Sequence, residues 1–261
     1  MRASFTRLPA AFLVIAAALL LTTTRASAAS APVEVSYPSG SETVHGLLYM
    51  PGGNTAAKHP AVIVIHEWWG LNDWVKEQAV DLAAHGYVAL AVDLYRGKVA
   101  NDPDTAHQLS RGLPPDRGIR DLKAADTYLS SRKDVDSHRI GAIGWCMGGG
   151  YALAFAVADP NLKAVVANYG PPPTDPDSLK QIHAAILGNY GGLDKGIPPD
   201  SVESFAADMK KLGKSVDIKI YPDAGHAFQN PGNKTGYRPQ DTADARSRYL
   251  HFFARELGGK P

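Results

Sequence analysis

Residues 144–150 read Gly144-Trp145-Cys146-Met147-Gly148-Gly149-Gly150, between an apolar run at 140–143 and a small-residue helical pattern that ends at Ala158. A G-x-C-x-G sequence at a strand-to-helix junction predicts a sharp turn, because a Cβ on either glycine would collide with neighbouring backbone. At the tip of such a turn Cys146 meets a helix N-terminus, where free N–H groups and the helix dipole favour a thiolate. We therefore expect Cys146 to be a nucleophile. The alternative is a tight packing turn with an inert core cysteine.

Apolar runs and amphipathic stretches alternate on both sides of this turn. Their spacing predicts strands at 33–37, 44–50, 61–65, 88–92, 140–143, 164–167, 184–187 and 216–220, and helices at 73–85, 119–131, 149–158, 201–212 and 242–257. The runs at 61–65 and 88–92 are apolar without alternation, which is typical of strands covered by helices on both faces. The pattern predicts an α/β fold with a mostly parallel sheet and helices on both faces.

Two further features complete this prediction. The turn-like sequence Pro38-Ser39-Gly40 separates the first two predicted strands and indicates an N-terminal antiparallel hairpin. The segments 99–115 and 170–177 are rich in Pro, Asp and Gly, and we expect them to be surface excursions near the strand ends.

The first residues of the chain differ from the rest. Arg2 and Arg7 precede an apolar run at 10–21, and Ala26-Ser27-Ala28 follows with a small-x-small cleavage pattern. A run of this length is too short to cross a bilayer. We expect residues 1–28 to be a secretory signal peptide that is cleaved after Ala28, which predicts a periplasmic or secreted protein; the alternative is an uncleaved anchor.

Composition limits the possible functions of the remaining residues, 29–261. The 261-residue chain has a formal net charge of +1 and no basic tract, so we expect no nucleic-acid partner. The length suits one α/β domain. Cys146 is the only cysteine and has no partner for an intramolecular disulfide.

An acid and a histidine follow two later predicted strands. Asp194 ends the sequence Gly188-Asn189-Tyr190-Gly191-Gly192-Leu193-Asp194, and His226 lies in Tyr221-Pro222-Asp223-Ala224-Gly225-His226. The order nucleophile, acid, histidine is that of α/β-hydrolases, in which all three lie at the carboxyl edge of a parallel sheet. We expect His226 to act as general base and Asp194 to orient its ring. The alternatives are a turn-capping acid and a solvated loop histidine.

These residues resemble the dienelactone hydrolase family, the cysteine-using branch of the α/β-hydrolases. The resemblance covers about residues 33–257. It is carried by the cysteine turn, the acid and histidine loops, and the sequences His66-Glu67-Trp68-Trp69-Gly70-Leu71-Asn72 and Asp93-Leu94-Tyr95. It implies an α/β-hydrolase fold and hydrolysis of an ester or lactone through a thioester, with no metal or organic cofactor.

The resemblance also assigns roles around the nucleophile. It implies that Glu67 takes part in switching the Cys146 thiol to thiolate, and that the N–H groups of Trp68 and Met147 form the oxyanion hole. A carboxylate near a thiol disfavours the thiolate unless it takes up a proton, so we expect a perturbed Glu67 pKa. The alternative for Glu67 is a helix-start acid. Trp68 and Trp69 are expected to line the pocket.

One departure concerns substrate binding. Family members that act on dienelactone hold its carboxylate with two arginines, one shortly after the Asp-Leu-Tyr segment and one four residues after the histidine. The second position is Asn230, which cannot form a bidentate charged pair. Arg96, next to Tyr95, is either the first arginine or an ordinary surface arginine. Specificity for an anionic lactone therefore does not follow, and a neutral ester, another lactone or a thioester is an equally good candidate substrate.

These interpretations predict a carboxylic ester hydrolase with Cys146, His226 and Asp194 as its triad and Glu67 as auxiliary acid. We expect Trp69, Tyr95, Arg96 and Asn230 to bind substrate. The expected partner is a small ester or lactone, and we expect a monomer without a stable membrane anchor. Two alternatives are a non-catalytic ligand-binding protein of the same fold and a thiol redox protein that uses Cys146.

Overall fold

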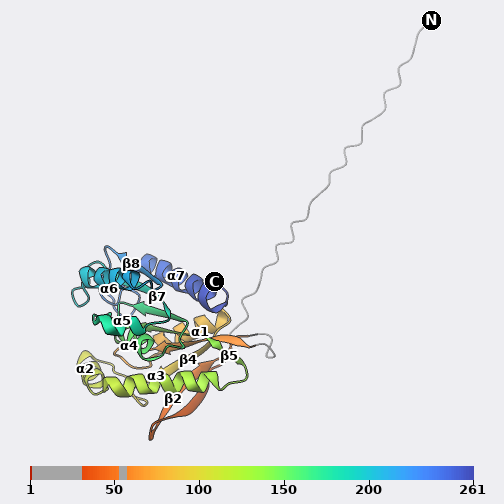
Figure 1. The fold of residues 1–261 in the computed structure, drawn as a ribbon, viewed down its shortest axis with the longest axis vertical. Helices are drawn as coiled ribbons and strands as arrows, with labels where there is room; N and C mark the ends of the chain where they lie inside the picture. The colour runs from red at the N-terminus through yellow and green to blue at the C-terminus, as the bar shows by residue number, and fades with distance from the viewer. Residues whose placement is uncertain (2–30, 53–57) are drawn as a thin grey trace.

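The computed structural model describes residues 1, 31–52 and 58–261 (Figure 1). Its strands are β1 (Val33–Ser39), β2 (Glu42–Tyr49), β3 (His59–Ile65), β4 (Val88–Asp93), β5 (Val135–Trp145), β6 (Ala164–Asn168), β7 (Ala185–Gly191) and β8 (Val216–Tyr221). Its helices are α1 (Asp73–Ala84), α2 (Pro103–Arg111), α3 (Pro115–Ser130), α4 (Met147–Ala158), α5 (Pro176–Gln181), α6 (Pro199–Lys211) and α7 (Pro239–Leu257). The expected signal peptide and its cleavage site lie outside the described residues.

Within these ranges the strands form one sheet in the order β1-β2-β4-β3-β5-β6-β7-β8. The pairs β1·β2 and β2·β4 are antiparallel. All the other neighbouring pairs are parallel. The mostly parallel sheet with an N-terminal antiparallel hairpin is therefore confirmed.

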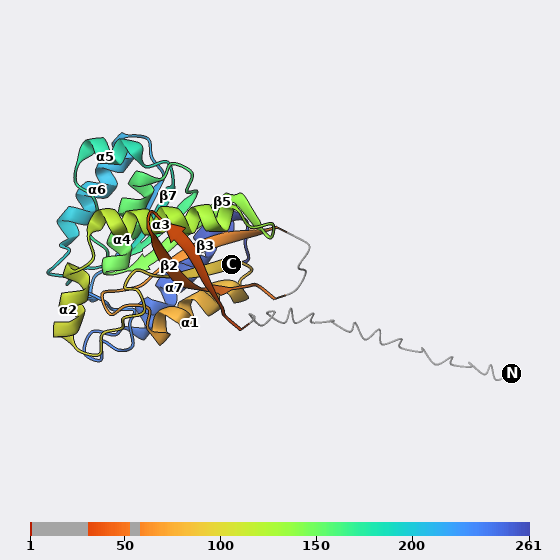
Figure 2. The same ribbon diagram turned by 90° about the horizontal axis from the view of Figure 1, so that it is seen from below.

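Helices cover both faces of the sheet. Figure 2 shows α3 and α4 on one side of the strands and α1 and α7 on the other. Along β3, Ile63 packs into the core on the α3 and α4 side, whereas Val62 and Val64 pack with α1 and α7. Both faces of the strand are buried, which explains why its sequence is apolar without alternation.

Two helices lie where we expected irregular surface segments. α2 occupies part of 99–115, and α5 begins within 170–177. The Asp102 side chain caps α2 by accepting from the Thr105 N–H, but Ala106 is the only buried residue of the helix. Apart from Ala106, only the partly buried Leu109 packs against the core, so the apolar periodicity of this helix is weak. α5 has six residues, of which one is buried.

The turn of the hairpin also differs from the prediction. Pro38 and Ser39 belong to β1 and pair with Thr43 and Glu42 of β2. The turn therefore lies at residues 40–41, where Gly40 adopts a φ of 62°. Proline is tolerated at Pro38 because β1 is the edge strand of the sheet.

The parallel strands bring four chemically important loops to one edge. Glu67 follows β3, Cys146 follows β5, Asp194 follows β7 and His226 follows β8. The carboxyl ends of neighbouring parallel strands lie at the same edge, which is where open α/β sheets bind ligands. Among the described residues, no helix has both the length and the apolar character that a bilayer span requires.

Candidate active site

Cys146 occupies a strained turn between β5 and α4. It precedes the first residue of α4 and adopts φ 52° and ψ −118°, a region that side chains other than glycine rarely occupy. A Cβ on Gly144 would overlap the Gly148 backbone, and a Cβ on Gly148 would overlap the carbonyl of Ile65. Both glycines are thus needed for β5, the turn and β3 to approach so closely, and Cys146 is held at the tip.

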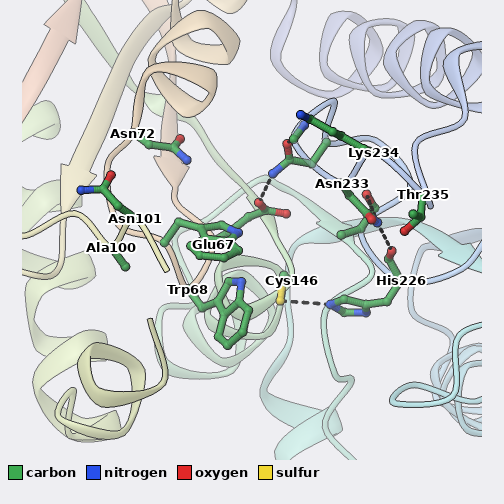
Figure 3. Close-up of a pocket in the computed structure, with 14 residues that line it drawn as sticks. Glu67, Trp68, Asn72, Ala100, Asn101, Cys146, His226, Asn233, Lys234 and Thr235 are labelled. Carbon is green, nitrogen blue, oxygen red and sulfur yellow. Dashed lines mark hydrogen bonds between the residues drawn. The ribbon is translucent and has the colours of Figure 1, made fainter. Parts of the chain in front are cut away.

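The imidazole of His226 lies between the sulfur of Cys146 and the carboxylate of Asp194. Figure 3 shows its contact with Cys146. His226 Nε2 is 3.1 Å from Cys146 Sγ, and His226 Nδ1 is 2.7 Å from Asp194 Oδ2. The other carboxylate oxygen of Asp194 accepts from the N–H groups of Gly196 and Ile197 at 2.9 and 3.1 Å. These backbone bonds fix the carboxylate so that its free oxygen orients the imidazole.

The electrostatics of this row favour a charged imidazole. Burial by itself disfavours imidazolium, but hydrogen bonds to Asp194 and Cys146 outweigh it and raise the pKa of His226 to about 10. Burial also opposes the Asp194 charge, yet the bonds from His226 and from the loop backbone lower the pKa of this carboxyl below its usual value. The hydrogen bonds of the imidazole to Asp194 and Cys146 therefore favour the protonated form of His226.

Glu67 is buried in the same pocket as Cys146. Asn230 Nδ2 donates to its Oε2 at 2.5 Å, and the Tyr169 hydroxyl donates to its Oε1 at 3.4 Å. Burial is the largest influence and outweighs these bonds, so the pKa of Glu67 rises from 4.5 to about 7. The pKa is perturbed, as the sequence predicted, and Glu67 can exchange a proton near neutral pH.

A cavity of about 890 Å³ opens over these groups. Cys146, His226 and Glu67 line it. Trp68 and Trp69 form part of its wall, with ring centroids 4.9 Å apart. Trp68 also meets the ring of His107 from α2 at 4.8 Å, so the unpredicted helix supports the wall of the cavity. The remaining lining residues are Asn72, Ala100, Asn101, Ala227, Asn230, Gly232, Asn233, Lys234 and Thr235.

Comparison with known proteins identifies the family. A sequence model of the dienelactone hydrolase family matches residues 44–257. The chain belongs to the dienelactone hydrolase family. A relative from Salmonella typhimurium strain LT2, whose name contains carboxymethylenebutenolidase, is 34% identical over 215 residues, which is 77% of this chain and 78% of the relative. A Bradyrhizobium relative, named for lactonase activity on 2-oxo-3-(5-oxofuran-2-ylidene)propanoate, is 31% identical over 227 residues. The matched region is 82% of this chain and 91% of the relative.

Solved structures agree with this assignment. A Klebsiella pneumoniae protein described as a dienelactone hydrolase superposes with a TM-score of 0.78 at 29% identity. The superposition covers 86% of this chain and 98% of the Klebsiella chain. A structure described as m3DLH gives a TM-score of 0.80 at 27% identity, covering 88% of this chain and all of its own. The α/β-hydrolase fold is thus confirmed.

Of the four residues predicted to bind substrate in this dienelactone hydrolase family member, two do not line the cavity. Arg96 points elsewhere, because its Nη2 lies 2.8 Å from Oδ2 of the buried Asp121. The hydroxyl of Tyr95 donates to Met147 Sδ at 3.2 Å, so this ring supports the cysteine turn from behind. Neither residue lines the cavity, whereas Trp69 and Asn230 do.

The two N–H groups expected to form the oxyanion hole belong to Met147 and Trp68. Met147 is the first residue of α4, so no carbonyl one turn earlier in the helix can accept its N–H. Trp68 follows Glu67 in the loop after β3 and lines the cavity.

Tyr169 is a site residue that sequence reasoning missed. It is fully buried, it donates to Glu67, and its ring meets His226 edge-on at 5.4 Å. Burial, followed by the charge of Glu67, raises the pKa of its phenol well above the usual value, so it remains a donor. Its position directly after β6, at the same sheet edge as Cys146, was the available signal.

A buried amide network was also missed. Gln229 accepts from the Trp145 indole N–H at 3.0 Å and donates to Asn168 Oδ1 at 2.9 Å. Asn168 in turn accepts the Cys146 N–H at its backbone carbonyl, at 3.0 Å. Gln229 lies three residues after His226, so this network ties the histidine loop to the cysteine turn.

Proposed function

We propose that this dienelactone hydrolase family member hydrolyses a carboxylic ester or lactone through a thioester on Cys146. The row of hydrogen-bonding distances from Asp194 through His226 to Cys146 is the observation that carries the proposal. A nucleophile beside a base that is oriented by a third group is the arrangement of covalent acyl-transfer catalysts. The names of the relatives, which include a lactonase, support the same substrate class.

The first half of the reaction transfers the acyl group to sulfur. His226 holds the proton of Cys146, and the thiolate attacks the carbonyl carbon of the ester. The carbonyl oxygen becomes an oxyanion, which the N–H groups of Met147 and Trp68 stabilise. When the tetrahedral intermediate collapses, the C–O bond breaks, His226 protonates the leaving oxygen, and a thioester remains on Cys146.

The second half releases the acid. His226 takes a proton from water, which attacks the thioester carbon at the same face. Collapse breaks the C–S bond, Cys146 leaves as thiolate, and the carboxylic acid is freed. Glu67 serves as an auxiliary acid, because its raised pKa allows it to take up or release a proton beside the sulfur near neutral pH.

A panel of short-chain esters and lactones tests the proposal. We expect turnover by the wild-type protein, no turnover by Cys146→Ala, and full turnover by the control Ser247→Ala, which changes an exposed residue of α7. Mass spectrometry after acid quench should show an acyl adduct on Cys146. Folded wild-type protein without turnover or adduct would favour a ligand-binding protein, and peroxide consumption by Cys146 would favour a thiol redox protein.

Export is part of the proposal. Arg2, Arg7, the apolar run and Ala26-Ser27-Ala28 support cleavage after Ala28 and a periplasmic or secreted location. The N-terminal sequence of the protein recovered outside the cytoplasm should begin at Ala29. Recovery of an intact N-terminus in a membrane fraction would instead indicate an uncleaved anchor.

A further inference from the structure

The charges that line the cavity are unevenly distributed. Glu67 lines the same cavity as Cys146, and among the described residues its side-chain hydrogen bonds come from the neutral groups of Asn230 and Tyr169. Arg96, which could have supplied positive charge, is held by Asp121 outside the cavity. The part of the cavity near the reacting carbonyl therefore contains the Glu67 carboxyl, the Cys146 sulfur and the imidazole of His226, which is already paired with Asp194 and Cys146, and it contains no lysine or arginine. An anionic substituent next to the scissile bond would lie close to the Glu67 carboxyl and would find no free cation to bind it.

Lys234 is the one lysine or arginine among the lining residues. Figure 3 places it on the far side of Glu67 from Cys146. Within the described ranges Lys234 takes no part in an ion pair; the lysines that do are Lys76, Lys180, Lys211 and Lys219. The Lys234 side chain is exposed and lines the cavity. An unpaired cation at this end of the cavity can receive a negative charge that is remote from the reacting atoms.

The cavity is large enough to separate these two ends. Its volume of about 890 Å³ is far larger than a small lactone ring requires and lies in the range of sites for extended ligands. The rings of Trp68 and Trp69 line it and offer an apolar surface to the intervening chain.

We propose, building on the proposed ester hydrolysis, that the substrate is uncharged around its reacting carbonyl and carries an anionic group at its far end, which Lys234 receives. The substrate class is thus an amphiphilic ester with a carboxylate or a similar anion separated from the ester by an apolar spacer. Glu67 disfavours a negative charge near the scissile bond, Asn230 supplies no cation to offset it, and Lys234 favours a negative charge at a distance.

Monoethyl esters of dicarboxylic acids of increasing length test this proposal. Each is compared with the uncharged ethyl alkanoate of the same chain length, and the ratio of the two kcat/KM values is measured. Monoethyl malonate should be hydrolysed about ten-fold or more less efficiently than its uncharged partner. The ratio should rise with spacer length until monoethyl suberate equals or exceeds its partner, and this gain should shrink at high salt.

Variants of Lys234 assign the effect to one side chain. Lys234→Gln should lower the suberate ratio by about three- to five-fold, and Lys234→Glu should lower it further. The control is Lys163→Gln, which removes an exposed lysine just before β6 at the opposite edge of the sheet and should leave the ratio unchanged. Because Lys234 is exposed, its variants are expected to fold.

The outcomes separate the two proposals. A ratio that is independent of spacer length, or one that does not respond to Lys234→Gln and Lys234→Glu, overturns the assignment of Lys234 while ester hydrolysis stands. The highest ratio for monoethyl malonate overturns the exclusion of charge near the carbonyl. Absence of Cys146-dependent hydrolysis for every ester overturns the proposed function together with this inference.

Discussion

Replacing Glu67 with glutamine should make the stability of the fold less dependent on pH. The Glu67 side chain is 1% exposed, and burial raises its pKa from 4.5 to about 7. A carboxyl group whose pKa is higher in the folded than in the unfolded chain destabilises the fold as pH rises from 4.5 through 7. At about 1.4 kcal/mol per pKa unit, its ionisation costs about 3 kcal/mol by about pH 8, of which about 1 kcal/mol is already present at about pH 5.

Relative to wild type, Glu67→Gln should therefore gain about 2 kcal/mol of stability between about pH 5 and pH 8. In a domain of this size, the Tm of Glu67→Gln minus the Tm of wild type should therefore be about 4–8 °C higher at pH 8 than at pH 5. The amide has one acceptor oxygen and loses one bond from Asn230 or Tyr169, but this loss occurs at both pH values and cancels.

Thermal unfolding followed by circular dichroism at the two pH values measures the effect. Glu203→Gln on α6 is the matched control, because this glutamate is exposed. The Tm difference between Glu203→Gln and wild type should be the same at both pH values. If the Tm difference between Glu67→Gln and wild type is also the same at both, burial does not raise the pKa of Glu67.

Three further substitutions have expected outcomes. Asp194→Asn should lower kcat by about 10³- to 10⁴-fold, because the imidazole loses its orienting acceptor. It should also shift the alkaline limb of the pH–rate profile below the His226 pKa of about 10. An unchanged pH–rate profile in stopped-flow or steady-state assays would contradict this. Arg96→Ala should cost about 3 kcal/mol in urea unfolding by leaving Asp121 buried without its cation, and a raised KM without a stability loss would instead restore a substrate-binding role. Gln229→Leu should cost about 2–4 kcal/mol and lower kcat, since two buried partners lose their bonds; wild-type stability and kcat would show that the histidine loop does not need this contact.

The sequence predicted the fold well because burial determines the pattern of each central strand. β3 and β4 are covered on both faces, so their runs are apolar throughout and their type and position were recognisable. The elements that were missed bury little. α2 contributes only Ala106 and the partly buried Leu109 to the core, so its periodic signal is weak.

The site was predictable where it depends on strand order and not where it depends on long-range contacts. That Asp194 and His226 lie close together could be predicted, because each follows a parallel strand and such strands end at one edge. The partner of Arg96 could not, because Asp121 lies on α3, and only the packing of α3 against the sheet brings the two together. Gln229 also belongs to no motif. Its role as a hydrogen-bonding link becomes visible only when the fold places Trp145 and Asn168 beside it.

The amide tie at Gln229 has a consequence for how the enzyme can be altered. Gln229 and Asn233 both anchor the segment that begins at His226, the latter by donating to the His226 carbonyl at 3.0 Å. Lys234 and Thr235 lie just beyond these anchors, at the cavity mouth. If the proposed ester hydrolysis is confirmed, a combinatorial library at these two positions should diversify the accepted esters while the hydrogen bonds that hold His226 are kept. This short stretch is therefore a good starting point for laboratory evolution.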